Sequence, residues 1–274
     1  MRRILFVPKA ALEEASSLLI AIPFDTPEQR VGKIEVSGVS GSQEVVALNS
    51  GQRALRIDVA AGQKPVVEIS FHDEAGGFPD WLFQPTGGQH ERASDELSAH
   101  VEALAPRHLP PAERVLRIVR HVEERFHYGL RDVGLGDDTE SLPPLVCGTH
   151  AGTCIDTHSY AVAALRTSGI DAAYVSGVFF DQGCEEAVPG HCWFVVRAED
   201  SPHHWDISHF LKYGLGPVRP VLNPLPGLRQ ALSAGRDLVF DGPDGACEIP
   251  VLSGFTHLAG PLRGSKLPTS VHLS

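Results

Sequence analysis

The residues whose types and spacing could do chemistry begin with a cysteine in the segment Gly152-Thr153-Cys154-Ile155-Asp156. Thr153 followed three residues later by Asp156 is typical of a capping box, which predicts a helix that begins at Cys154. The thiol would then lie at the positive end of the helix dipole, where the reactive thiolate is favoured. A small buried cysteine at a helix start is the alternative reading of the helix alone, because buried free cysteine is common.

A nucleophilic cysteine needs a base within reach, and the base needs an acceptor that orients it. His191 is the candidate base because it lies at the mouth of an apolar strand, residues 192–196. Asp206 follows a polar turn at residues 198–202, and a hairpin folded about residue 199 brings His191 opposite roughly residue 207. We therefore expect Asp206 to be a cross-strand neighbour that can hold the imidazole.

The order of these segments resembles the transglutaminase-like superfamily of cysteine enzymes. The motifs that carry the resemblance, in chain order, are Gly152-Thr153-Cys154-Ile155-Asp156, Leu165-Arg166-Thr167-Ser168-Gly169-Ile170, Tyr174-Val175-Ser176-Gly177, His191-Cys192-Trp193 and Trp205-Asp206. The resemblance covers residues 150–210 and implies a catalytic triad, with Cys154 as nucleophile, His191 as general base and acid, and Asp206 as the orienting carboxylate. Three positions depart from the family pattern and bear on substrate specificity: Asp171, Ala173 and Ile207.

The resemblance implies attack of the Cys154 thiolate on the amide or ester carbonyl of a peptide or small substrate, which gives a thioester. Hydrolysis, as in a peptidase or amidase, is the first expectation, because nothing in the sequence resembles the calcium-regulated domains of cross-linking members. Acyl or aminoacyl transfer to an amine acceptor is the alternative within the same chemistry. A non-catalytic domain that keeps the fold and binds peptides is the alternative from another class.

An enzyme of this type needs two donors for the oxyanion of its tetrahedral intermediate. The backbone N–H of Cys154 is the natural first donor, and Tyr128 and Trp81 are both candidates for the second. His158 lies one turn further along the helix that starts at Cys154, beneath the sulfur. We interpret His158 as a core or site-lining histidine and not as a rival base.

The chain has five cysteines and no CxxC spacing, so neither a disulfide framework nor a zinc ribbon is predicted. We interpret one cysteine as chemical and four as small buried hydrophobes, with Cys184 in a polar loop that favours exposure. A metal site from Cys147, Cys184, His191 and Cys192 matches no common zinc spacing. The acidic loop at residues 132–140 lacks the ligand order of an EF-hand. The sequence therefore predicts neither a metal nor another cofactor.

The composition is that of an ordinary globular protein, with 42% hydrophobic and 21% charged residues. The net charge of −11 argues against nucleic acid and anionic membrane surfaces as partners, because both repel an acidic protein. The apolar stretch at residues 4–7 is too short for a signal peptide or a membrane span. We therefore expect a cytoplasmic location; the sequence does not indicate an oligomeric state.

The elements that must position these residues suggest an α+β fold. Residues 1–78 are predicted as a β-rich domain from alternating segments at 33–37, 55–59 and 67–71. Residues 79–274 are predicted as a papain-like catalytic domain with a C-terminal extension, in which a cysteine-bearing helix packs on an antiparallel sheet. Its expected helices are a Pro110-Pro111-initiated segment to about residue 126 and residues 154–167. Its expected strands are residues 172–180, 192–197, 205–208, 236–241 and 246–252.

Overall fold

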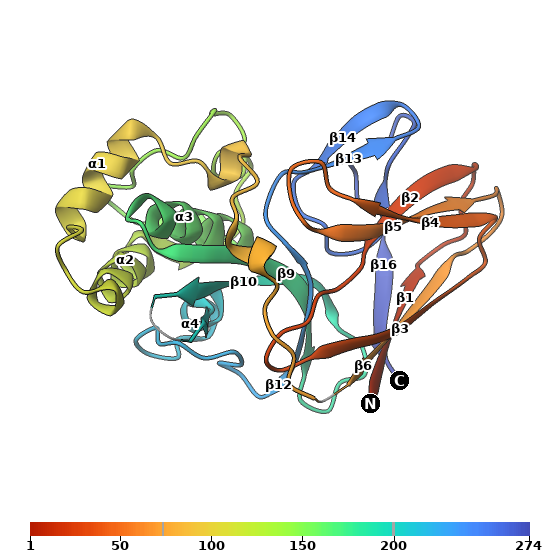
Figure 1. Ribbon diagram of the computed structural model, residues 1–274, viewed down its shortest axis with the longest axis horizontal. Helices are drawn as coiled ribbons and strands as arrows, with labels where there is room; N and C mark the ends of the chain where they lie inside the picture. Colours follow the sequence, from red (N-terminus) through yellow and green to blue (C-terminus); the bar gives the residue numbers. More distant parts are fainter. Residues whose placement is uncertain (73, 199–200) are drawn as a thin grey trace. The chain divides into compact units, whose positions relative to one another are not determined.

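The computed structural model describes residues 1–72, 74–198 and 201–274 (Figure 1). Contacts divide the chain into two compact units. The β unit comprises residues 1–84, 176–191 and 226–274, and the helical unit comprises residues 85–175 and 192–225. Strands β9 (Asp171–Asp181) and β10 (Val188–Arg197) each begin in one unit and end in the other.

The β unit contains two four-stranded sheets, with strand orders β16-β1-β6-β3 and β15-β2-β5-β4. Alternation of apolar and polar residues explains the first sheet, because Ile4 pairs with Ile69 and Phe6 with Val67, and all four side chains are buried. The bounds of the strands are β1 (Arg2–Pro8), β2 (Ser16–Ala21), β3 (Arg30–Ser37), β4 (Gly41–Val46), β5 (Arg53–Val59), β6 (Val66–His72), β15 (Thr256–His257) and β16 (Thr269–Leu273). The predicted β-rich N-terminal region is therefore confirmed.

The C-terminal part of the chain joins the same unit as the N-terminal strands. Strand β16 pairs with β1, and β15 pairs with β2, both antiparallel. Strands β13 (Leu238–Gly242) and β14 (Gly245–Ile249) form a hairpin close to the two predicted strand segments. This division differs from the predicted boundary at residue 78, because pairing between the two ends of the chain is not visible in local patterns.

The helical unit holds α1 (Asp95–Leu104), α2 (Pro111–Arg125), α3 (Cys154–Thr167) and α4 (Ile207–Tyr213), and α1 and α2 both contact α3 (Figure 1). Helix α2 begins with Pro111 at its first position, and α3 has the predicted bounds. Buried side chains of α3 share one hydrophobic core with Tyr174 of β9 and Phe194 of β10. No helix in the described parts of the chain is long and apolar enough to cross a membrane.

A four-stranded sheet with the order β11-β10-β9-β12 carries the histidine strand. Strand β11 (His203–Trp205) pairs antiparallel with β10 in a register that sets Phe194 against Trp205, and β12 spans Gly227–Ala234. This register agrees with the predicted hairpin, whose turn residues 199 and 200 lie outside the described residues. The predicted strand at 205–208 is wrong beyond Trp205, because the Asp206 side chain accepts the backbone N–H of His209 and starts α4.

A contact between two histidines joins α1 to α2, and of the two, His121 is buried and His100 is half-buried. The Nε2 atoms of His100 and His121 lie 3.4 Å apart. Burial lowers the pKa of His121 from 6.5 to about 4, and the positive charges of His100 and Arg125 act in the same direction. Between pH 6.5 and 4, His121 is therefore protonated in the unfolded chain but neutral in the folded chain.

We expect the free energy of unfolding to fall by about 1–2 kcal/mol through His121 when the pH drops from 7.5 to 5. His121→Gln removes the titrating group and should lose this part of the pH dependence. Urea unfolding of both proteins at the two pH values measures the difference. Equal pH slopes for the two proteins would show that His121 does not carry the effect.

Candidate active site

Cys154 is the first residue of α3, and the predicted capping box is present. The Thr153 hydroxyl accepts the backbone N–H of Ile155 at 3.3 Å, and Asp156 Oδ2 accepts the backbone N–H of Thr153 at 2.9 Å. Asp156 is itself buried and also accepts the backbone N–H of Leu135. The start of α3 is thus fixed from both sides, and it holds the largely buried thiol at the positive end of the helix dipole.

The glycine before the cap is required by close packing. A Cβ added at Gly152 would lie 2.6 Å from the ring of Phe126, in strand β7 (Phe126–Tyr128). Strand β7 runs parallel to β8 (His150–Gly152), which pairs Tyr128 with Gly152. The short parallel pair therefore brings Tyr128 to the segment that leads directly into Cys154.

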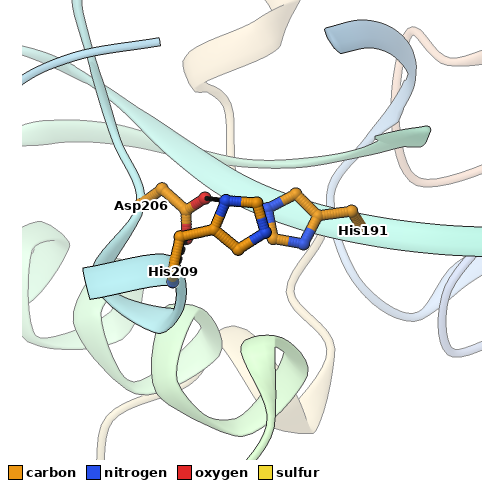
Figure 2. A group of neighbouring side chains, drawn as sticks. All are labelled: His191, Asp206 and His209. Carbon is orange, nitrogen blue, oxygen red and sulfur yellow. Dashed lines mark hydrogen bonds and ion pairs between the residues drawn. The ribbon is translucent and has the colours of Figure 1, made fainter. Parts of the chain in front are cut away.

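The side chains of His191, Asp206 and His209 lie together, as Figure 2 shows, with their ligand atoms within 4.8 Å of one another. Asp206 is fully buried, and its Oδ1 accepts the Ser208 hydroxyl at 2.7 Å and the backbone N–H of His209 at 3.0 Å. Asp206 Oδ2 lies 3.2 Å from His209 Nδ1, the contact drawn as a dashed line. These contacts fix the orientation of the Asp206 carboxylate, which in its ionised form could stabilise an imidazolium.

Sequence reasoning missed His209. The signal that could have found it is a histidine three residues after Asp206, because the side chains of the cap residue and of position N3 meet at a helix start. The expectation of a strand through residue 208 concealed this spacing, since a strand turns residues 206 and 209 to opposite faces. His209 also packs edge-on against Tyr213, with ring centroids 5.6 Å apart.

His158 lies beneath the site, as predicted for a core or site-lining histidine. Its side chain is fully buried, and its Nε2 accepts the backbone N–H of Ser208 at 3.3 Å. The same nitrogen lies 3.5 Å from Asp206 Oδ1, and the ring lies 5.5 Å from that of Phe194. His158 therefore ties α3 to the start of α4 and supports the position of Asp206.

The two candidates for the second oxyanion donor lie in different surroundings. Burial raises the pKa of Tyr128, and the charge of Cys154 acts in the same direction. Trp81 instead packs edge-on against Phe24 within the β unit, at 5.6 Å. The pairing of Tyr128 with Gly152, two residues before Cys154, favours Tyr128 as the donor, and this role stays a prediction.

Cys192 and Cys247 are buried, but Cys147 and Cys184 are exposed. The interpretation as a buried hydrophobe is therefore wrong for Cys147, whereas the exposure of Cys184 agrees with the expectation from its polar loop. Cys147 lies in the long loop before β8, and Cys184 lies in the turn after β9, where neither side chain reaches a core.

We expect iodoacetamide at pH 6 to alkylate Cys154 before the other four cysteines. An ordinary thiol is almost fully protonated at pH 6, whereas a thiol at a helix N-terminus is favoured as the thiolate. Mass spectrometry after brief labelling measures the order of reaction, with exposed Cys147 and Cys184 as internal controls for accessibility. Faster labelling of either control would contradict the assignment of Cys154.

The ligand atoms of His191, Asp206 and His209 are close enough to share one cation. Asp206 already accepts three contacts from its own helix, however, so the arrangement is explained without an ion. We predict that dialysis against EDTA leaves activity unchanged and that added zinc inhibits by occupying His191. Loss of activity in EDTA that zinc or calcium restores would contradict the prediction of a metal-free enzyme.

Part of the chain matches a known protein family, and several solved structures are similar to it. Residues 100–215 match the model of the transglutaminase-like superfamily. A solved structure described as a "putative cysteine protease" from Cytophaga hutchinsonii is 13% identical, with a TM-score of 0.58 over 100% of this chain and 97% of that chain. The periplasmic domain of TgpA from Pseudomonas aeruginosa is 16% identical over 78% of this chain and 89% of that chain, with a TM-score of 0.37.

The search of the curated proteins finds no match. The matched segment contains Cys154, Asp206 and all four helices of the helical unit except the first residues of α1. The predicted α+β class, with a β-rich N-terminal region, is also confirmed. The chain therefore contains a transglutaminase-like core domain within residues 100–215.

Proposed function

We propose that the protein is a cysteine-dependent acyl-transfer enzyme that hydrolyses an amide or ester through a thioester. The observation that carries the proposal is a cysteine at the capped N-terminus of a helix within a transglutaminase-like core. A thiol in that position is favoured as a thiolate, which is the nucleophilic form. The closeness of His191 to Asp206 supports the assignment of base and orienting carboxylate.

The proposed reaction proceeds in two halves. The Cys154 thiolate attacks the carbonyl carbon, and the oxyanion that forms is stabilised by the N–H groups of the first turn of α3. Collapse expels the amine or alcohol, which takes a proton from the His191 imidazolium, and leaves a thioester. His191 then removes a proton from water, which attacks the thioester and releases the carboxylic acid.

Hydrolysis is proposed ahead of transfer because water needs no binding site, whereas an amine acceptor must be held against the thioester. Both acceptors attack the same carbonyl and use the same oxyanion stabilisation. The two reactions therefore differ in what reaches the thioester and not in the residues that form it.

The test is a competition between water and an amine for one acyl group. The protein is incubated with p-nitrophenyl acetate and a panel of peptide amides and esters, with and without a fluorescent primary amine. We expect Cys154-dependent release of acid, with little acyl-amine product. Predominant incorporation of the amine into a glutamine-bearing protein, without cleavage of any amide, would instead establish a transglutaminase.

A further inference from the structure

A cavity of about 350 Å³ lies in the β unit, between the connection from β1 to β2 and the connection from β15 to β16. Residues 11–17 line it from the first connection, and His257, residues 259–262 and Leu267 line it from the second. All of these residues belong to the β unit, so the cavity is formed within one compact body. Its volume lies within the range of sites for small organic ligands. The cavity is therefore a candidate site for a small molecule.

The cavity has a buried inner end and an exposed mouth. Among the residues that line it, Ser17 is 8% exposed and His257 is 6% exposed. Glu13 and Glu14 are both exposed, and Leu262 is 57% exposed. A ligand that enters from solvent therefore meets two carboxylates and an apolar side chain before it reaches the imidazole.

His257 is held in one orientation at the inner end. Its Nδ1 lies 3.1 Å from the Ser16 hydroxyl oxygen. Its backbone N–H donates to the Ser265 carbonyl at 2.9 Å, and its own carbonyl accepts the N–H of Gly264 at 2.8 Å. Burial lowers the pKa of His257 below its ordinary 6.5, so the ring is neutral near pH 7. Because Ser16 engages Nδ1, Nε2 is the ring nitrogen that remains to meet a ligand.

This environment defines the group that fits the inner end. A neutral imidazole presents Nε2 as a donor or as an acceptor, according to the tautomer that the Ser16 contact sets. A hydroxyl group can both donate and accept, so it satisfies either tautomer. A charged group would lose its hydration there, because the charged residues that line the cavity, Glu13 and Glu14, are both exposed.

The mouth favours the opposite kind of group. Two neighbouring carboxylates attract a cation, and the net charge of −11 makes the surroundings more favourable to one. We propose that this cavity binds a small amino alcohol, whose hydroxyl contacts His257, whose carbon chain packs on Leu12 and Leu262, and whose ammonium lies at Glu13 and Glu14. The inference does not depend on the chemistry of Cys154 and gives the β unit a binding function of its own.

Three ligands of similar length test the two ends of the proposed site. Aminopentanol has an ammonium at one end of the chain and a hydroxyl at the other, pentylamine lacks the hydroxyl, and pentanediol lacks the ammonium. Isothermal titration calorimetry on the full chain gives each Kd. We expect aminopentanol to bind about 5-fold more tightly than pentylamine and about 2- to 5-fold more tightly than pentanediol. Its binding should also shift the His257 ring signals in NMR spectra, assigned with His257→Phe.

Variants at each end make the test specific. His257→Phe keeps a ring in the buried position but removes both nitrogens, so it should weaken aminopentanol about 5-fold and leave pentylamine unchanged. Glu13→Gln combined with Glu14→Gln should weaken both amines about 2- to 5-fold at low ionic strength and leave pentanediol unchanged. Glu35→Gln is the matched control, because Glu35 is exposed on β3 and does not line the cavity. It should alter none of the three affinities.

Several results would overturn the proposal. Equal affinities of the three ligands for the unaltered protein would show that neither end of the cavity selects its group. Affinities that stay unchanged in His257→Phe and in the glutamate variant would place the binding elsewhere, and so would unshifted His257 signals at saturation. Absence of saturable binding at tens of millimolar ligand would exclude the site. Thermal unfolding checks each variant, and the exposed glutamates provide the test if His257→Phe does not fold.

Discussion

Cys154→Ala should reduce the hydrolysis of p-nitrophenyl acetate and of any accepted peptide amide by at least about 10⁴-fold. The expected loss is this large because no thioester can form without the sulfur, and neighbouring groups cannot replace the nucleophile. The substitution removes one sulfur atom from a largely buried position, so the fold should persist. Initial rates measured at substrate concentrations well below saturation give the comparison.

Cys147→Ala and Cys184→Ala are the matched controls for this experiment. Both thiols are exposed, and neither begins a helix, so activity should stay within about twofold of the unaltered protein. Thermal unfolding of all three variants should show that the folded state is retained. Activity that survives in Cys154→Ala and disappears in a control would move the nucleophile to the other cysteine.

The parts of the site that the sequence predicts are those whose local structure is determined by interactions between residues close together in the sequence. The capping box joins Thr153 to Asp156 over a single turn, so its residue types alone fix where α3 begins. The register of β10 and β11 follows from the position of the turn between them, which sets Phe194 against Trp205. The order of the motifs likewise placed His191 and Asp206 close together, and the catalytic roles assigned to Cys154, His191 and Asp206 stay predictions.

The parts that the sequence does not predict depend on contacts between distant segments. The parallel pairing of β7 with β8 brings Tyr128 to Gly152, although neither three-residue strand has an alternating pattern long enough to read. The pairing of β1 with β16 joins the two ends of the chain, and it moves residues 226–274 into the β unit. Pairings of this kind are decided by packing and not by local propensity.

Asp206 lies at the junction of a strand and a helix, so its local sequence fits both elements. A strand ends at Trp205 and a helix begins at Ile207, so Asp206 is at once the end of a hairpin and a helix cap. Its cap contacts use Oδ1, and Oδ2 contacts His209. The helix start therefore fixes the carboxylate rigidly, as the orientation of a catalytic imidazole requires.

Asp206→Asn should cut kcat by about 10²- to 10⁴-fold while the fold is kept. Asparagine is a good N-cap, so its Oδ1 can still accept the Ser208 hydroxyl and the His209 backbone N–H. The negative charge that stabilises the His191 imidazolium is lost, however, and the amide cannot hold the same tautomer. The rates of steady-state hydrolysis and of Cys154 alkylation at pH 6 should both fall, because fewer thiolate–imidazolium pairs form.

His209→Asn is the variant that shows whether Asp206 orients His191 or His209 during catalysis. The asparagine amide can replace His209 Nδ1 as a neutral donor to Asp206 Oδ2, so a supporting role predicts a loss of kcat below about 10-fold. If Asp206 instead acts through His209, His209→Asn should be as damaging as Asp206→Asn, and His191→Asn should be mild. The ratio of the effects of His191→Asn and His209→Asn on kcat therefore identifies the base, and a ratio below one would remove His191 from that role.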